Sequence, residues 1–394
     1  MPCFEVPAPV YFGPDARLEV LPVLRKQGWA KAGVVIDAAL TSQEVFKDYL
    51  ERRLPEAGLA PSIVYASRAG AEPDYGYLDE AAAAFRGKAL DCVLGLGGGS
   101  AMDLAKGVAI LLTNPGRGLD YRGMDRVAKP GVPVVVFPTT AGTGSEVTKT
   151  ASFSDLDEKK KLGINGRFVA AWAGVLDPVL TLGCPREPSM AAGMDALVHC
   201  VESFSAGPSP RAAREAARTA FPLLFNHLAR ALERPGELPG REAMLLGAWW
   251  AGVAMWNAGA GGPASGASYP LGVLHKVPHG FAGGLLLPKV VRFNVEAGWR
   301  GYEPLYDLIE EREASPRDGK SQAFARAFEA LWERAGAPRH FGRWGVDAAA
   351  VPALVEDTLK NRAANLSHNP VPFGRAETEA LLQAVAGPRE TIAR

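Results

Sequence analysis

The stretch "GLGGGSAMDLAKG" (95–107) decides the fold, because a strand, a glycine-rich turn and a helix follow one another without a break. "DCVLGL" (91–96) predicts a buried strand, and "SAMDLAKGVAILL" (100–112) predicts a helix with Ser100 as its N-cap. Glycines let a ligand approach the backbone closely, and the free N–H groups of a helix start suit a phosphate. The spacing is not GxGxxG, so this turn alone is equally consistent with a tight turn that binds nothing.

Strands and helices alternate on both sides of this stretch. Apolar strand-like runs occur at "AGVVID" (32–37), "PSIVYA" (61–66) and "VPVVVFP" (132–138), with helix-like runs at "QEVFKDYLERRL" (43–54) and "LDEAAAAFRG" (78–87). Such alternation predicts a parallel sheet that is covered on both faces. The segment "TKTASFSDLDEKKKLGIN" (148–165) predicts two strands joined by a charged turn, whereas "VLDPVLTLGCPREP" (175–188) looks irregular.

The second half of the chain has a different pattern. Segments such as "REAARTAFPLLFNHLARAL" (214–232) and "EAMLLGAWWAGVAMWNAG" (242–259) have helical spacing, and "GAGGPASG" (259–266) suggests a loop between helices. We therefore expect an α/β dinucleotide-binding domain with a parallel sheet over residues 1–185, and an all-helical metal and substrate domain over residues 186–394.

The composition is that of an ordinary soluble enzyme. Among 394 residues, 43 Lys and Arg balance 43 Asp and Glu, which argues against partners such as nucleic acid or a membrane surface. No secretory signal precedes the first strand, and no apolar run reaches the length of a membrane span. Four scattered cysteines, Cys3, Cys92, Cys184 and Cys200, fit a reduced, cytoplasmic setting.

A second turn, "PTTAGTGSE" (138–146), also follows a strand and combines glycines with hydroxyls. Two such turns at the carboxyl ends of strands in one parallel sheet indicate a dinucleotide-binding crevice. Asp37 ends the first strand, where its carboxylate can accept hydrogen bonds from ribose hydroxyls and would repel a 2′-phosphate. Asp37 therefore favours NAD over NADP, unless it is only a turn or N-cap aspartate.

The stretch "GMDALVHCVESF" (193–204) places Asp195 and His199 four residues apart in an apolar run. On a helix these two side chains share one face, and their apolar neighbours predict that the helix is buried. A buried carboxylate needs a partner. Either a divalent metal or an Asp–His hydrogen bond would provide one, and the pair alone leaves both open.

Taken together, these motifs resemble the iron-dependent (group III) alcohol dehydrogenase family, which has a dehydroquinate synthase-like fold. The resemblance is carried by "GGGSAMDLAK" (97–106), "PTTAGTGSE", "GMDALVHCVES" and "VPHGFAGGLLLPKVVRFN" (277–294), with "NLSHNPVPF" (365–373) near the end. It runs from the first strand almost to the C-terminus.

The resemblance implies which residues form the site. Asp195, His199 and His279 match metal ligands, so that iron or zinc would act as a Lewis acid while nicotinamide transfers a hydride. The residues expected to bind NAD or NADP are Asp37, Gly97, Gly98, Gly99, Ser100, Asp103, Thr139, Thr140, Thr143, Ser145 and Lys161. Lys161 also fits a solvated run of charges.

The chain departs from the family at one point. Where the family commonly has two histidines four residues apart, this chain has Ser265 and Tyr269. Three hypotheses remain open: Asp195, His199 and His279 hold a metal with water, His275 replaces the lost ligand, or the site works without metal. In the third case Tyr269, His199 or Lys276 would polarise the substrate carbonyl.

The resulting functional prediction is an NAD(P)-dependent oxidoreductase, an alcohol dehydrogenase or aldehyde reductase for a small alcohol or aldehyde. Lys149 and Lys276 would favour an anionic substrate if both point inward, and surface exposure is the alternative. Rival functions are a metal-independent reductase of the same fold, a dehydroquinate synthase-type lyase that cycles NAD, and a catalytically inactive nucleotide binder. Family members are often dimers, so we expect a homo-oligomer.

Overall fold

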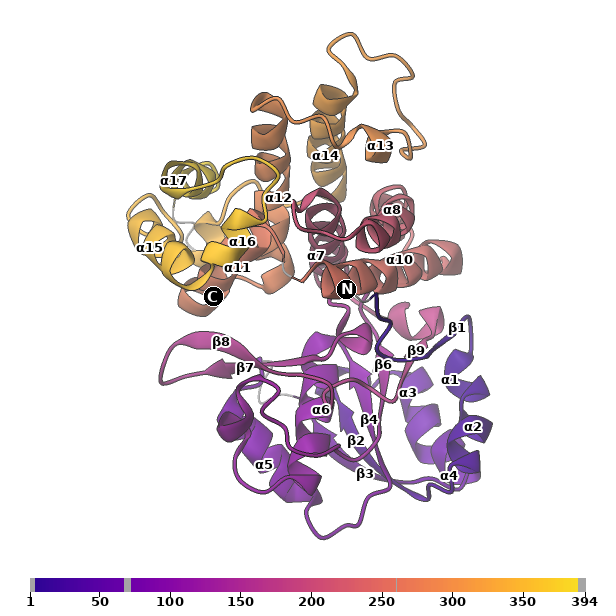
Figure 1. Cartoon of the computed structure of the whole chain (residues 1–394). Helices are drawn as coiled ribbons and strands as arrows, with labels where there is room; N and C mark the ends of the chain where they lie inside the picture. Colours follow the sequence, from indigo (N-terminus) through magenta and orange to yellow (C-terminus); the bar gives the residue numbers. More distant parts are fainter. Residues whose placement is uncertain (1–3, 67–71, 260, 389–394) are drawn as a thin grey trace. The chain divides into compact units, whose positions relative to one another are not determined.

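The computed structural model describes residues 4–66, 72–259 and 261–388, which form two compact units. One unit is Val6–Cys184, and the other begins at Pro185 and also takes in Phe4 and Glu5. The first unit contains the sheets, and the second is built from helices (Figure 1). Within the described ranges, no helix combines the length and the apolar character that crossing a membrane requires.

A parallel sheet forms the centre of the first unit. Its strand order is β1-β9-β6-β4-β2-β3, and every neighbouring pair is parallel, as predicted. The strands are β1 (Val10–Phe12), β2 (Lys31–Ile36), β3 (Ala60–Tyr65), β4 (Cys92–Gly97), β6 (Val134–Pro138) and β9 (Ala173–Leu176). The sequence did not predict β1 and β9, which are short and pair with each other at one side of the sheet.

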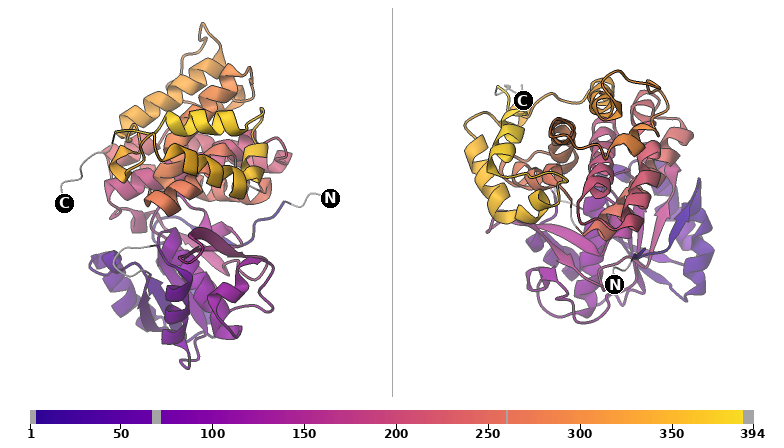
Figure 2. Two further views of the ribbon diagram at one scale, coloured as in Figure 1. Left: turned by 90° about the vertical axis from the view of Figure 1, so that its left-hand side faces the viewer. Right: turned by 45° about the horizontal axis from the view of Figure 1, so that its top comes forward.

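Helices cover both faces of this sheet (Figure 2). Alternate residues of β2 point to opposite cores: Val34 and Ile36 pack with the N-terminal helices, whereas Val35 packs with α5 and α6. The helices are α1 (Ala16–Glu19), α2 (Leu21–Lys26), α3 (Glu44–Asp48), α4 (Leu54–Glu56), α5 (Tyr75–Phe85) and α6 (Gly99–Thr113). The doubly covered sheet confirms the α/β prediction.

A smaller sheet has the order β5-β8-β7. Its strands are β5 (Gly123–Met124), β7 (Thr150–Asp155) and β8 (Lys160–Asn165). The antiparallel pair β7–β8 is the hairpin that the charged segment 148–165 predicts.

In the second unit, the described residues form helices and no strand, which agrees with the predicted all-helical half. They are α7 (Arg186–Ser205), α8 (Arg211–Phe225), α9 (Leu228–Glu233), α10 (Leu238–Ala258), α11 (Pro263–His275), α12 (His279–Glu296), α13 (Glu303–Tyr306), α14 (Lys320–Ala335), α15 (Val351–Asn361), α16 (Ala363–Ser367) and α17 (Arg375–Gln383). The predicted loop 259–266 is too long, because α11 already begins at Pro263. Proline suits this position, since the first N–H of a helix has no intrahelical partner.

Candidate active site

The glycine-rich turn connects β4 directly to α6. The prediction that Ser100 caps α6 is wrong, because Gly98 is the N-cap residue and Ser100 lies exposed inside the first turn. Gly97 has a φ of 151°, a conformation that side chains rarely adopt, and this lets the chain enter the helix early. The N–H groups at the start of α6 are therefore not covered by a capping side chain.

The second predicted turn packs against the first. The N–H of Thr139 donates to the carbonyl of Gly97 at 2.9 Å. A Cβ on Gly99 would lie 2.7 Å from the Thr143 side chain, and one on Gly98 would lie 3.3 Å from Thr140 Oγ1. Glycine is thus required at position 99 for the two turns to meet, and the threonine hydroxyls lie beside the start of α6.

Asp103 ties these turns to the small sheet. One of its oxygens accepts from Ser145 Oγ at 2.5 Å, and the other accepts from the Ser152 N–H at 2.9 Å. Lys106, one turn further along α6, is 1% exposed and donates to the carbonyls of Thr148 and Thr150. Burial lowers the pKa of Lys106, and the nearby Asp103 carboxylate opposes that shift. Asp103 is therefore placed to position the turns.

Asp37 and Lys161 already have partners within the protein. Asp37 follows β2 and accepts from the Ala39 N–H, so it caps a short 3₁₀ helix, and its Cβ faces Gly97. Lys161 lies on β8 and forms an ion pair with Glu72 at 3.0 Å. The contact of Asp37 matches the N-cap alternative, and Asp37 also lies beside the glycine turn. Lys161 is half-buried, so it is not a fully solvated charge.

The second unit brings three predicted metal ligands together. Ligand atoms of Asp195, His199 and His279 all lie within 4.8 Å of one another. Asp195 Oδ1 is 3.6 Å from His199 Nε2 and 3.8 Å from His279 Nε2. Asp195 and His199 are 3% and 7% exposed, which confirms the predicted buried helix.

The donor set fits a divalent ion. One carboxylate and two imidazoles that converge with such spacing suit iron or zinc and leave a position for substrate. His199 faces Asp195 with Nε2, while its Nδ1 is buried and has no hydrogen-bond partner among the described residues. His275 is not part of this group, because α11 ends at His275 and α12 starts only at His279.

Two residues of α11 contact His279. Ser268 Oγ donates to the Ser265 carbonyl at 2.7 Å and lies 3.4 Å from His279 Nδ1. Because its proton is used, this hydroxyl can accept from Nδ1–H, which leaves His279 Nε2 unprotonated on the side of Asp195. The Tyr269 ring packs edge-on against His279 with 5.3 Å between ring centres.

Ser265 takes part in a different interaction from the histidine that the family has there. Its N–H and its side chain hydrogen-bond to Glu202, a buried carboxylate on α7. Glu202 also accepts from the N–H groups of Gly262 and Ala264 at 2.6 and 2.7 Å, so it caps α11 from another helix. Burial raises the pKa of Glu202, and these donors oppose the shift. Sequence reasoning missed this residue.

The two lysines considered for an anionic substrate have different surroundings. Lys276 is exposed in a left-handed conformation after α11, which agrees with surface exposure, and Lys149 is half-buried in the first unit. The sequence missed Arg362, whose guanidinium carbon lies 3.6 Å from the centre of the Tyr269 ring. The only signal in the sequence is that Arg362 is an arginine, because its spacing from Tyr269 does not predict a contact between them.

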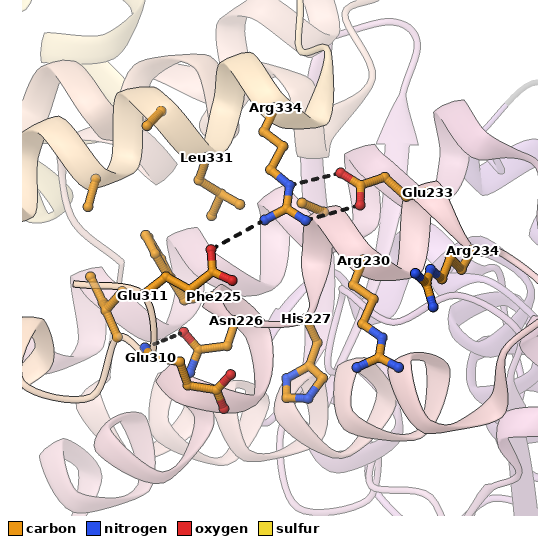
Figure 3. Close-up of a pocket in the computed structure, with 14 residues that line it drawn as sticks. Phe225, Asn226, His227, Arg230, Glu233, Arg234, Glu310, Glu311, Leu331 and Arg334 are labelled. Atoms are coloured by element: carbon orange, nitrogen blue, oxygen red, sulfur yellow. Dashed lines mark hydrogen bonds and ion pairs between the residues drawn. The ribbon is translucent and has the colours of Figure 1, made fainter.

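A separate hollow of about 480 Å³ lies among α8, α9 and α14 (Figure 3). Its charged side chains neutralise one another: Arg334 pairs with both oxygens of Glu233 and approaches Glu311 at 4.0 Å. His227 also lines this hollow. None of the predicted site residues lines this hollow.

Comparison with known proteins places this arrangement in a family. The model of "Iron-containing alcohol dehydrogenase" matches residues 7–178, and that of "Fe-containing alcohol dehydrogenase family, C-terminal" matches residues 189–386. An NAD-dependent methanol dehydrogenase of Bacillus methanolicus is 31% identical over 91% of this chain and 93% of that protein.

Solved structures agree with the sequence comparisons. A crystal structure of 1,3-propanediol oxidoreductase aligns with a TM-score of 0.90 at 30% identity, over 98% of this chain and 100% of that one. A sulfoacetaldehyde reductase of Bifidobacterium kashiwanohense, in complex with NAD⁺, aligns with a TM-score of 0.84 at 26% identity, over 98% and 99%. The chain belongs to the iron-containing alcohol dehydrogenase family, as its motifs and fold predict.

Proposed function

We propose that this chain is an NAD-dependent alcohol dehydrogenase that interconverts a small alcohol and its aldehyde. The observation that carries the proposal is the convergence of Asp195, His199 and His279 in a chain of this family. The reaction class is hydride transfer between nicotinamide and the carbon that bears the substrate oxygen.

Asp195, His199 and His279 would hold the metal. When bound there, a divalent ion supplies a Lewis acid for the substrate oxygen. The carboxylate of Asp195 supplies negative charge that balances part of the charge of the ion. Ser268 keeps the His279 tautomer whose Nε2 lone pair faces the cluster.

The cofactor would bind over the two turns at the carboxyl ends of β4 and β6. Gly97, Gly98 and Gly99 allow its phosphates to approach the backbone, and the start of α6 attracts their charge. The hydroxyls of Thr139, Thr140 and Thr143 lie along this turn. Asp103 and Ser145 position the turns through their hydrogen bond. Asp37, Ser100 and Lys161 complete the proposed set of cofactor-binding residues.

The test joins metal content with activity. Elemental analysis should find about one equivalent of iron or zinc per chain, and NADH oxidation with propanal should be lost on chelation and restored by the metal. His199→Ala should lose both metal and activity, whereas His275→Ala should keep both. Full activity in a chelated, metal-free protein would contradict the metal part of the proposal and favour the metal-independent reductase.

Cellular location and assembly complete the proposal. Among the described residues, Cys92, Cys184 and Cys200 form no disulfide, which supports a reducing, cytoplasmic location, while Cys3 lies outside them. We also include a homodimer, as is common in this family. Light scattering on the purified chain would reveal the mass of the assembly, and a monomeric mass would contradict this part.

A further inference from the structure

We propose that Arg362 makes this enzyme selective for short aldehydes and alcohols that carry an oxyanion, such as a carboxylate, sulfonate or phosphonate. The inference rests on the proposed function, because it names the substrate class of the same site. It concerns a residue that the metal and cofactor arguments do not use.

The guanidinium of Arg362 lies over the ring of Tyr269. Arg362 lies between α15 and α16, and its guanidinium carbon is 3.6 Å from the centre of the Tyr269 ring. The same ring also meets His279 edge-on, with 5.3 Å between ring centres. A positive charge therefore stands one aromatic ring away from a proposed metal ligand.

The fold places the Arg362 segment on α11. Gly266 has no side chain, and a Cβ there would lie 2.8 Å from Asn365 Cβ and 3.6 Å from Arg362 Cβ. Asn365 Nδ2 donates to the Gly261 carbonyl at 3.1 Å, which fixes α16 against the turn before α11. Packing and a hydrogen bond thus hold the backbone at Arg362 and α16 against α11.

A guanidinium that stacks on an aromatic ring can still donate hydrogen bonds. Stacking on an aromatic ring occupies one face of the Arg362 group and leaves its in-plane N–H donors directed sideways. A guanidinium carries five donors, so it can keep contacts within the protein and still bind an oxyanion with two parallel hydrogen bonds. Tyr269 thus acts as a platform for Arg362, in a position where the family commonly has a histidine.

The consequence concerns substrate length. An aldehyde oxygen at the Asp195–His199–His279 cluster and an oxyanion at Arg362 would be separated by about the width of the Tyr269 ring. A substrate with one to four carbons between its two functional ends matches this separation, at roughly 1.3 Å of reach per bond along an extended chain. Net recognition of the oxyanion should contribute a factor of about ten or more in affinity.

The test compares substrates that are matched in length. Succinic semialdehyde is paired with butanal, and phosphonoacetaldehyde with propanal. The unmodified enzyme should show a kcat/KM at least about tenfold higher for the anionic member of one pair, and the pair with the larger ratio tells carboxylate from tetrahedral oxyanion. Arg362→Gln should remove that preference through KM, while the neutral aldehydes change by less than about threefold. Arg300→Gln, an exposed arginine of the same unit, is the matched control.

A second readout does not depend on turnover. Ethanesulfonate, a poor metal ligand, should bind the purified protein in calorimetry, and Arg362→Gln should raise its Kd about tenfold, with Arg362→Lys in between. If butanal and propanal are reduced but neither anion preference nor ethanesulfonate binding depends on Arg362, the inference is wrong and the proposed function stands. If no aldehyde is reduced, the proposed function fails, and ethanesulfonate binding still decides the role of Arg362.

Discussion

Replacing Glu202 by alanine should destabilise the helical unit by a predictable amount. The Glu202 carboxylate is 3% exposed and accepts from three backbone N–H groups, those of Gly262, Ala264 and Ser265. Each buried N–H that loses its acceptor costs about 1–3 kcal/mol. Relief from burying a carboxylate offsets several kcal/mol of that sum. We therefore expect a net loss of about 3–5 kcal/mol in the free energy of unfolding.

Differential scanning calorimetry measures this loss. At about 2–4 °C per kcal/mol for a unit of this size, Glu202→Ala should lower the Tm of the helical unit by roughly 6–20 °C. Glu202→Gln keeps one acceptor oxygen and should lose about 1–2 kcal/mol. Glu215→Ala on α8 is the matched control, because that exposed carboxylate has only a distant ion pair, at 3.9 Å, with Arg218.

The comparison of Glu202→Ala with Glu215→Ala can refute this role of Glu202. If Glu202→Ala and Glu215→Ala lower the Tm equally, within about 2 °C, the three N–H groups do not depend on Glu202. A loss confined to Glu202→Ala with an unchanged Glu202→Gln would instead mean that volume, rather than acceptor capacity, is what the side chain provides.

Asp103, Tyr269 and the buried thiols Cys92 and Cys200 each lead to a further prediction. Asp103→Asn keeps only one of two acceptors, so steady-state kinetics should show a KM for NAD that rises about tenfold with a smaller change in kcat; an unchanged KM would argue against positioning. Tyr269→Phe keeps the platform for Arg362, so kcat should change by less than about threefold, whereas a larger fall would make the hydroxyl catalytic. Burial raises the pKa of the Cys92 thiol to about 12 and that of Cys200 further, so mass spectrometry should find both unalkylated by iodoacetamide at pH 8 until urea is added.

The parts of the fold that the sequence predicts are those with a local physical cause. The continuous apolar runs of β2 and β4 are buried on both faces, so their pattern depends little on what packs against them. β9 lies partly in a segment that looks irregular, since four residues leave no period to detect and only the neighbouring strands make it a strand. The Ser100 cap was wrong because the glycines before it enter the helix earlier than a side-chain cap would.

The site residues that the sequence predicts are likewise those with a local signal. Asp195 and His199 could be predicted together because helical spacing puts them on one face, and the resemblance added His279. The roles of Glu202 and Arg362 could not be predicted. Both side chains contact α11, which lies far from them in the sequence, and only the tertiary structure creates these contacts. The sequence comparison with the family marked positions 265 and 269 as losses, without indicating what the new side chains do.

The contacts of Ser265 and Tyr269 indicate that these two residues give α11 new interactions in place of the two family histidines. Ser265 hydrogen-bonds to Glu202, which stands on α7 two turns beyond Asp195, so the helix that carries two proposed metal ligands also fixes the start of α11. Tyr269 keeps the contact with His279 and adds a flat surface for Arg362. A histidine at position 269 would instead be available as a metal ligand. Its ring is smaller than that of tyrosine, and a bound metal ion would make that ring a poor partner for the positive charge of Arg362. A chain with tyrosine there gives up one ligand and gains a fixed positive charge beside the site. That exchange is favourable only for a substrate that brings its own negative charge.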